Sequence, residues 1–264
     1  MAQQLTDGHG RRFEYLRLSL TDVCNFRCSY CLPDGYRKQA GLPASLTVRE
    51  TGRLIAAFAR LGLWKVRLTG GEPSLRPELL DIARTVAATP GIRKLAMTTN
   101  GYRLASRAAD YAAAGITALN VSVDSLDPAR FAAITGHDRL DGVLDGIAAA
   151  RLAGIASIKL NSVLMRGVND DELEGFISFV QRHDLALRFI EEFPLIAEAG
   201  RGSDWAYAGW YQEMLGLTHP DLLPIAYRDE GCPKDKLLTV GGSRTGVIIP
   251  LPPPGECAEA LIEA

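Results

Sequence analysis

The sequence contains little cysteine, little histidine and almost no net charge. Its 264 residues include 5 cysteines and 4 histidines, and the formal net charge is −2. So few cysteines argue against the disulfide framework of a secreted domain, and the charge balance provides no basic footprint for nucleic acid. No apolar run approaches transmembrane length, and the first seven residues lack the apolar core of a signal peptide. We therefore expect a cytoplasmic protein with reduced thiols that binds neither nucleic acid nor a membrane.

Three of the five cysteines are concentrated in one short stretch. Cys24, Cys28 and Cys31 have the spacing C-x3-C-x2-C, directly after an alternating apolar run. Thiolates are soft ligands that suit iron–sulfur clusters and zinc. Structural zinc normally takes four ligands, and the nearest histidine in the sequence, His9, lies well upstream. Three thiolates favour a [4Fe–4S] cluster with one open iron, and three unrelated reduced cysteines are the alternative.

Strand-like apolar runs alternate with helical patterns over most of the chain. The expected strands are Tyr15–Leu20, Trp64–Leu68, Ile92–Thr98, Ile116–Val123, Ser157–Leu164 and Leu185–Ile190. A capping-box pattern, Thr47 with Glu50, opens a helix that ends at Gly62. Further helices are expected at Pro77–Ala88, Leu104–Ala114, Pro128–Ile134, Leu140–Ala153 and Asp170–His183, the last capped by Asn169. Six alternations predict an α/β fold with a parallel sheet, which could be an open doubly wound sheet or an incomplete barrel.

Several of the expected strands contain cations, although strands of a parallel sheet are usually covered on both faces. These cations are Arg17, Lys65, Arg67, Lys159 and Arg188. Each could reach solvent at a strand end or pair with a nearby carboxylate. Because burying an unpartnered cation is costly, five of them on four strands favour a shared anionic ligand such as a polyphosphate.

The cysteine stretch and four other segments together resemble a known family. Leu16–Pro33 resembles the cluster loop of radical S-adenosylmethionine (SAM) enzymes. In order along the chain, Leu68–Pro73, Thr98–Gly101, Val121–Asp127 and Arg188–Glu191 are similar to the GTP 3′,8-cyclase family of molybdenum-cofactor biosynthesis. The resemblance covers about Arg11 to Arg188 and implies a partial (β/α)6 barrel, in which an open iron binds SAM and its reductive cleavage gives a hydrogen-abstracting 5′-deoxyadenosyl radical.

The resemblance also implies roles for individual residues. It gives Cys24, Cys28 and Cys31 as ligands of one [4Fe–4S] cluster. It places Tyr30, Gly70, Gly71, Glu72, Thr98 and Ser122 around SAM, with Asn100 and Asp124 as weaker candidates. It assigns the five strand cations to the binding of the triphosphate of GTP or of a similar phosphorylated substrate. It also implies a reductase or a flavodoxin-type protein as the electron donor. No general acid–base pair stands out, and His137, His183 and His219 are interpreted as surface or loop residues.

The resemblance weakens after the sixth expected strand. We expect an N-terminal arm at 1–13, the barrel at 14–192 and an irregular C-terminal tail at 193–264 that packs on it. The family carries a second cluster held by three more cysteines, whereas only Cys232 and Cys257 remain here. We therefore expect one cluster per chain, with these two as spare thiols, and Phe193 stands where the family often has methionine.

The leading hypothesis is a radical SAM enzyme that abstracts hydrogen from a phosphorylated substrate, most simply a nucleotide. The same radical machinery could instead act on another anionic metabolite or a peptide. A paralogue that binds SAM or nucleotide without turnover is the third hypothesis, because the cysteines of a second cluster are not all present.

Overall fold

The computed structural model describes residues 4–6, 12–38, 41, 44–191, 223–225, 236–239 and 246–249. The chain forms two compact units. Unit 1 comprises Met1–Ser122 and Asp127–Ile158, and unit 2 comprises Val123–Leu126 and Lys159–Ala264. The predicted division into arm, barrel and tail stays a prediction.

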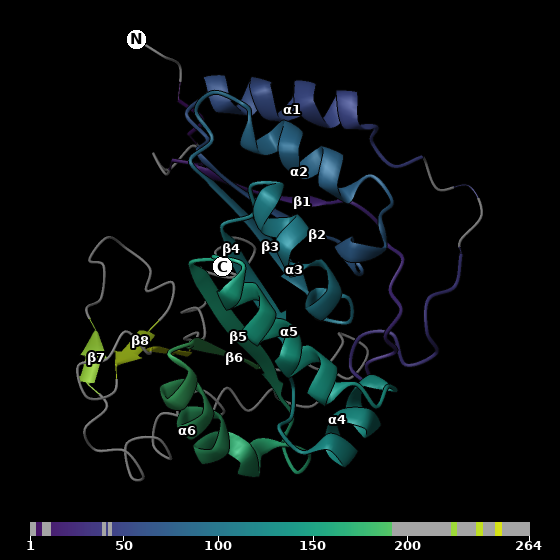
Figure 1. The fold of residues 1–264 in the computed structure, drawn as a ribbon, viewed down its shortest axis with the longest axis vertical. Coiled ribbons are helices and arrows are strands. Elements are labelled where there is room, and N and C mark those ends of the chain that lie inside the picture. Colours follow the sequence, from purple (N-terminus) through teal and green to yellow (C-terminus); the bar gives the residue numbers. More distant parts are fainter. Residues whose placement is uncertain are drawn as a thin grey trace, which may run out of the picture. The chain divides into compact units, whose positions relative to one another are not determined.

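Unit 1 is built on parallel strands in the order β1-β2-β3-β4. These strands are β1 (Tyr15–Ser19), β2 (Lys65–Thr69), β3 (Lys94–Thr99) and β4 (Ala118–Ser122). The helices of this unit are α1 (Val48–Arg60), the 3-10 helix η1 (Pro73–Leu75), α2 (Leu79–Ala87), α3 (Leu104–Ala113), α4 (Pro128–Thr135) and α5 (Leu140–Leu152). Contacts join α1 to α2, α2 to α3 and α3 to α5, so these helices lie side by side along the strands (Figure 1).

Local sequence signals account for most of these boundaries. The predicted capping box is present, because Glu50 N–H donates to Thr47 Oγ1 and the Glu50 carboxylate accepts from Thr47 N–H. The chain leaves α1 through Gly62, whose φ of 96° favours glycine. Pro77 was expected in the first turn of the next helix, but α2 begins at Leu79, two residues later.

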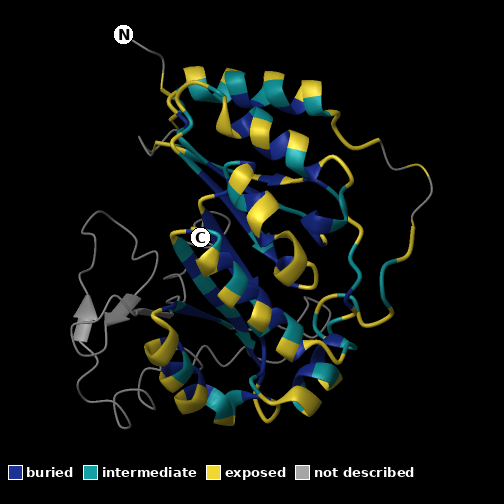
Figure 2. Cartoon of the chain, in the orientation of Figure 1, coloured by how far each residue is buried: buried dark blue, intermediate teal, exposed yellow. Residues whose placement is uncertain are grey.

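The core of unit 1 lies between the strands and these helices. One side of the strands is apolar and fully buried, and its members are Val66, Leu68, Leu95, Met97, Leu119 and Val121. Each helix is buried along one stripe and exposed along the other, as Figure 2 shows. Gly146 of α5 has no room for a Cβ against Leu104 of α3, so the two helices pack closely. The opposite side of the strands carries the polar residues described below.

Unit 2 contains most of β5 (Ser157–Leu164), the 3-10 helix η2 (Asp170–Glu172), α6 (Leu173–His183) and β6 (Ala186–Glu191). Strands β5 and β6 are parallel, β6 pairs in parallel with β9 (Gly246–Ile249), and β9, β8 (Lys236–Thr239) and β7 (Leu223–Ile225) pair antiparallel. Along the chain β1 to β6 therefore alternate with helices, which confirms the predicted α/β class.

The prediction for Asn169 is wrong. Its side chain does not cap α6, which begins at Leu173 after a 3-10 turn. Instead its Nδ2 donates to the carbonyls of Asp124 (2.6 Å) and Val163 (2.8 Å), while its Oδ1 accepts from Met165 N–H. Asn169 is fully buried, so these bonds satisfy it and fix the ends of two segments of unit 2. Within the described residues, no helix is long and apolar enough to cross a membrane.

Candidate active site

The three clustered cysteines lie in the loop between β1 and α1 of unit 1. Cys24 and Cys28 are half-buried and Cys31 is exposed, and all three are thiols. The amides of Cys31 and Leu32 both donate to the Cys28 carbonyl at 2.9 Å, which makes a tight turn. No set of three or more His, Cys, Asp or Glu side chains in the described ranges is arranged to hold a metal ion. An iron–sulfur cluster differs from a single metal ion because each of its irons takes one thiolate. The three thiols are therefore of the right chemical kind to bind such a cluster.

The start of this loop is joined to the turn that follows β2. Gly71 N–H donates to the Thr21 carbonyl (2.7 Å), and Glu72 N–H donates to the Val23 carbonyl (2.8 Å). A Cβ on Gly70 would overlap the Thr21 carbonyl, and one on Gly71 would overlap the Val23 carbonyl. Gly70 also has a φ of 145°, a conformation that favours glycine. The two glycines thus let the turn approach the cysteine loop closely, and their predicted contact with SAM stays a prediction.

Glu72 connects this turn to the end of β3. Its side chain is 1% exposed. One carboxylate oxygen accepts from Ser74 N–H (2.9 Å) and the Thr99 hydroxyl (2.8 Å), and the other accepts from Asn100 N–H (2.7 Å). Burial raises the pKa of this carboxyl group, and the hydrogen bonds oppose that shift. The carboxylate therefore holds the turn and the β3 end in one arrangement.

The first cysteine is in contact with the same network. Burial raises the pKa of the Cys24 thiol, while hydrogen bonds from the Phe26 amide and the Asn100 side chain lower it. Asn100 Nδ2 also donates to Asn25 Oδ1 at 3.0 Å. Asn100 was a weak sequence candidate, and the structure places it against the cysteine loop.

His137 also contacts the cysteine loop, which the sequence interpretation as a surface or loop residue did not reveal. Its Nε2 is 2.7 Å from the Asn25 carbonyl oxygen, and its ring stacks on Phe26 with centroids 5.0 Å apart. Phe26 is buried and also meets Phe131 of α4 and Tyr102 edge to face. Because His137 follows Asn25 by 112 residues, no local spacing could have indicated the contact.

We expect His137→Ala to loosen the cysteine loop. The variant loses one hydrogen bond and one ring stack, so the free energy of unfolding should fall by about 1–3 kcal/mol. Urea unfolding followed by circular dichroism measures the change. His183→Ala is the control, because it removes an exposed ring that contacts Phe179 of the same helix, α6, and lies outside the cysteine loop. Equal losses in the two variants would contradict the anchoring role.

Three of the five predicted cations lie on one face of the strands in unit 1. Arg17 pairs in register with Arg67, and Lys65 lies two residues before Arg67 on β2. Arg67 is 7% exposed, Lys65 is half-buried and Arg17 is exposed. Lys65 Nζ and the Arg67 guanidinium lie 4.3 and 5.3 Å from the Tyr15 ring centroid. The structure thus places Lys65 and Arg67 against the Tyr15 ring, with Arg17 on the same face of the neighbouring strand.

The other two cations belong to unit 2. Arg188 of β6 is 9% exposed and pairs in register with Asn161 of β5. Lys159 lies two residues before Asn161 and therefore shares its face. Asp124 is buried and accepts from Val163 N–H (2.8 Å), so its side chain supports the β5 end in this unit.

Two of the remaining predicted SAM residues of unit 1 lie at or near strand ends, and the third lies in the cysteine loop. Thr98 is on β3, Ser122 is the last residue of β4, and Tyr30 is a half-buried residue of the cysteine loop. Their roles stay predictions. Phe193, Cys232 and Cys257 lie outside the described residues.

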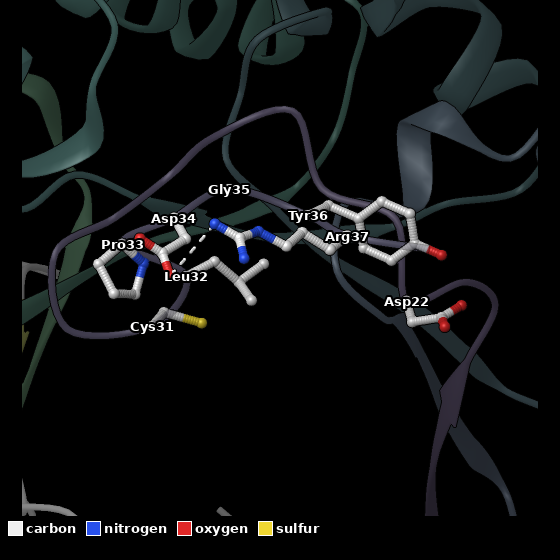
Figure 3. Close-up of a pocket in the computed structure, with 8 residues that line it drawn as sticks. All are labelled: Asp22, Cys31, Leu32, Pro33, Asp34, Gly35, Tyr36 and Arg37. Atoms are coloured by element: carbon white, nitrogen blue, oxygen red, sulfur yellow. Dashed lines mark ion pairs between the residues drawn. The ribbon is translucent and has the colours of Figure 1, made fainter. Parts of the chain in front are cut away.

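A cavity of about 490 Å³ opens beside the third cysteine. The residues that line it are Asp22, Cys31, Leu32, Pro33, Asp34, Gly35, Tyr36 and Arg37. Figure 3 shows the ion pair of Arg37 with Asp34 in this segment, at 3.6 Å. Both members are more than three-quarters exposed, so the pair adds little stability.

The comparison with known families defines the class. Residues 18–180 match the Radical SAM superfamily, so the chain belongs to that superfamily. The Streptococcus suis protein SuiB, solved bound to S-adenosylmethionine, has the same fold, with a TM-score of 0.63 at 14% identity over 78% of this chain and 48% of SuiB. These matches confirm the predicted radical SAM fold and the predicted cofactor class, a [4Fe–4S] cluster with SAM.

Relatives of high sequence identity indicate one family within the superfamily. The GTP 3′,8-cyclase of Aeromonas hydrophila is 57% identical over 191 residues, which are 71% of this chain and 56% of that protein. The GTP 3′,8-cyclase of Stenotrophomonas maltophilia K279a is 58% identical over 188 residues, 71% of this chain and 57% of that protein. The predicted family resemblance is confirmed, and the chain spans a little over half the length of these relatives.

Proposed function

We propose that this chain is a radical SAM enzyme that abstracts hydrogen from a nucleoside triphosphate, as a GTP 3′,8-cyclase of molybdenum-cofactor biosynthesis does. The observation that carries the proposal is the buried Arg67, with Lys65 and Arg17 on the same face of strands that lead to the cysteine loop. The identity to two GTP 3′,8-cyclases over the same residues supports it.

The cysteine loop and its neighbouring turn would hold the cofactors. Cys24, Cys28 and Cys31 would supply the thiolates, and the turn that begins at Gly70 would meet the methionyl end of SAM. When bound there, a cluster would supply the one electron that converts SAM to methionine and a 5′-deoxyadenosyl radical. Glu72 would keep the turn in place, because its carboxylate already accepts three hydrogen bonds from the protein.

The cations would orient the substrate by its phosphates. Arginine presents a fork of donors that matches phosphate oxygens, and lysine adds a point charge. Arg67 is almost fully buried, so solvent and salt screen its interaction with a phosphate less than that of a surface arginine. For Lys159 and Arg188, which belong to unit 2, binding of a phosphorylated substrate stays a prediction.

We expect Arg67→Ala to weaken GTP binding selectively. A lost charge-assisted hydrogen bond corresponds to about 1.5–3 kcal/mol, or roughly ten- to a hundredfold in Kd. Anaerobic equilibrium dialysis with GTP and guanosine measures it, and guanosine affinity should not change. Arg93→Ala is the matched control, since Arg93 also stacks on a ring, 4.8 Å from Trp64, but is exposed. If wild-type protein binds guanosine as tightly as GTP, the nucleotide proposal is wrong, and another anionic metabolite or a peptide replaces it.

Two further features follow from the proposed chemistry. The cluster must be reduced, so a reductase or a flavodoxin-type protein is the proposed electron donor. The cytoplasm is the proposed compartment, because it keeps thiols reduced.

A further inference from the structure

A row of polar side chains lies between the cations and the cysteine loop in unit 1. Arg67, Ala96 and Ala118 are in register across β2, β3 and β4. The next residues on the same face of β3 and β4 are Thr98 and Asn120, which are also in register. Ser122, which is predicted to contact SAM, lies two residues after Asn120 on the same face of β4.

Asn120 has a buried polar group without a hydrogen-bond partner among the described residues. The side chain is 3% exposed, and its Nδ2 donates to no acceptor in the part of the chain that the structure describes. The Thr98 Oγ1 beside it likewise has no hydrogen-bond partner there. Unsatisfied buried polar atoms are rare and costly. A pair of them on neighbouring strands therefore indicates a ligand that completes their hydrogen bonds.

The direction of the side chain follows from its strand. Val121, the next residue, lies close to Gly101, and so does Val143 of α5, so the Val121 side chain faces the helices. Since successive side chains of a strand point to opposite faces, Asn120 points away from the helices and toward the face with Arg67. Ala96 and Ala118, on the same face, carry only methyl side chains.

The spacing of these rows matches the order of parts in a nucleotide. A strand rises about 3.3 Å per residue, so Asn120 lies about 7 Å beyond the Arg67 row and about 7 Å before Ser122. A substrate whose phosphates meet Arg67 and whose reacting carbon meets the adenosyl group must place its sugar between them. Asn120 is at that level.

We propose that Asn120 donates a hydrogen bond to a ribose hydroxyl of the nucleoside triphosphate and so positions the sugar for hydrogen abstraction. This inference rests on the proposed function. It adds a residue that reads the sugar, whereas the cations bind the phosphates.

The test combines protein variants with deoxy analogues. Dissociation constants of GTP, 2′-deoxy-GTP and 3′-deoxy-GTP are measured for the reconstituted wild type, Asn120→Ala and the nearly isosteric Asn120→Asp. Wild-type protein should bind one deoxy analogue about tenfold more weakly than GTP. Both variants should bind GTP about tenfold more weakly than wild type, and Asn120→Ala should also lose the discrimination against that analogue. Thr117→Ala, an exposed polar residue beside the start of β4 whose hydroxyl donates to the Leu95 carbonyl, should behave as wild type.

Two outcomes would overturn the inference and leave the proposed function intact. One is wild-type protein that prefers GTP to guanosine but discriminates against neither deoxy analogue. The other is an Asn120→Ala protein, folded by circular dichroism, that discriminates as strongly as wild type. If wild-type protein has no preference for the triphosphate, the proposed function fails first and this inference fails with it.

Discussion

Cys31→Ala protein should hold less than one iron per chain after anaerobic reconstitution, against about four for wild type. Cys31 is the most exposed of the three thiols, so its removal should disturb the fold least while removing one of the three cluster ligands. Two thiolates cannot hold three irons. In the presence of dithionite as reductant, the release of 5′-deoxyadenosine from SAM should therefore fall below detection. Iron analysis and chromatography of the products measure the two effects.

Cys232→Ala is the matched control, because the same atom is removed from a thiol that we predict to be spare. It should keep the iron content and deoxyadenosine release of wild type. If Cys31→Ala retains full iron, or if Cys232→Ala loses it, the assignment of the cluster to Cys24, Cys28 and Cys31 is contradicted.

Glu72→Leu should be the most destabilising single substitution at the site. Leucine keeps the volume but leaves Ser74 N–H, Thr99 Oγ1 and Asn100 N–H without their acceptor in a buried place. Each of the three orphaned donors costs about 1–3 kcal/mol, so the free energy of unfolding should fall by at least about 3 kcal/mol. Urea unfolding followed by circular dichroism measures it.

Two comparison variants make the result specific. Glu72→Gln should lose about 1–3 kcal/mol, because either orientation of its amide directs NH2 at a backbone N–H of Ser74 or Asn100. Glu78→Leu, which changes a half-exposed acid that pairs with Arg76 at 2.7 Å, should lose less than about 1 kcal/mol. A Glu72→Leu protein as stable as wild type would show that the carboxylate does not hold the turn.

The sequence was most informative where the signals are local. The capping box at Thr47 and the cysteine spacing lie within a few residues, and the structure realises the first as predicted. The alternation of strands and helices is likewise a sum of local preferences, which gave the α/β class correctly. Asn169 was misassigned because a polar residue before a helix is a typical cap, whereas here a buried long-range network uses its side chain instead.

Contacts between distant segments were beyond sequence reasoning. His137 meets Asn25 across 112 residues, and Glu72, in the turn after β2, reaches Asn100, which follows the end of β3. Gly70 and Gly71 suggested close approach to a ligand, and the structure shows close approach to the cysteine loop itself. Asn120 could have been noticed, because a polar residue in an apolar strand is the same signal that drew attention to the cations.

The most direct test of this account is the fate of a substrate hydrogen. Reconstituted protein is incubated anaerobically with SAM, dithionite and GTP deuterated on the ribose, and the 5′-deoxyadenosine is analysed by mass spectrometry. We expect 5′-deoxyadenosine that carries one deuterium. Unlabelled 5′-deoxyadenosine from fully ribose-deuterated GTP, or none at all from protein that holds its cluster, would contradict it.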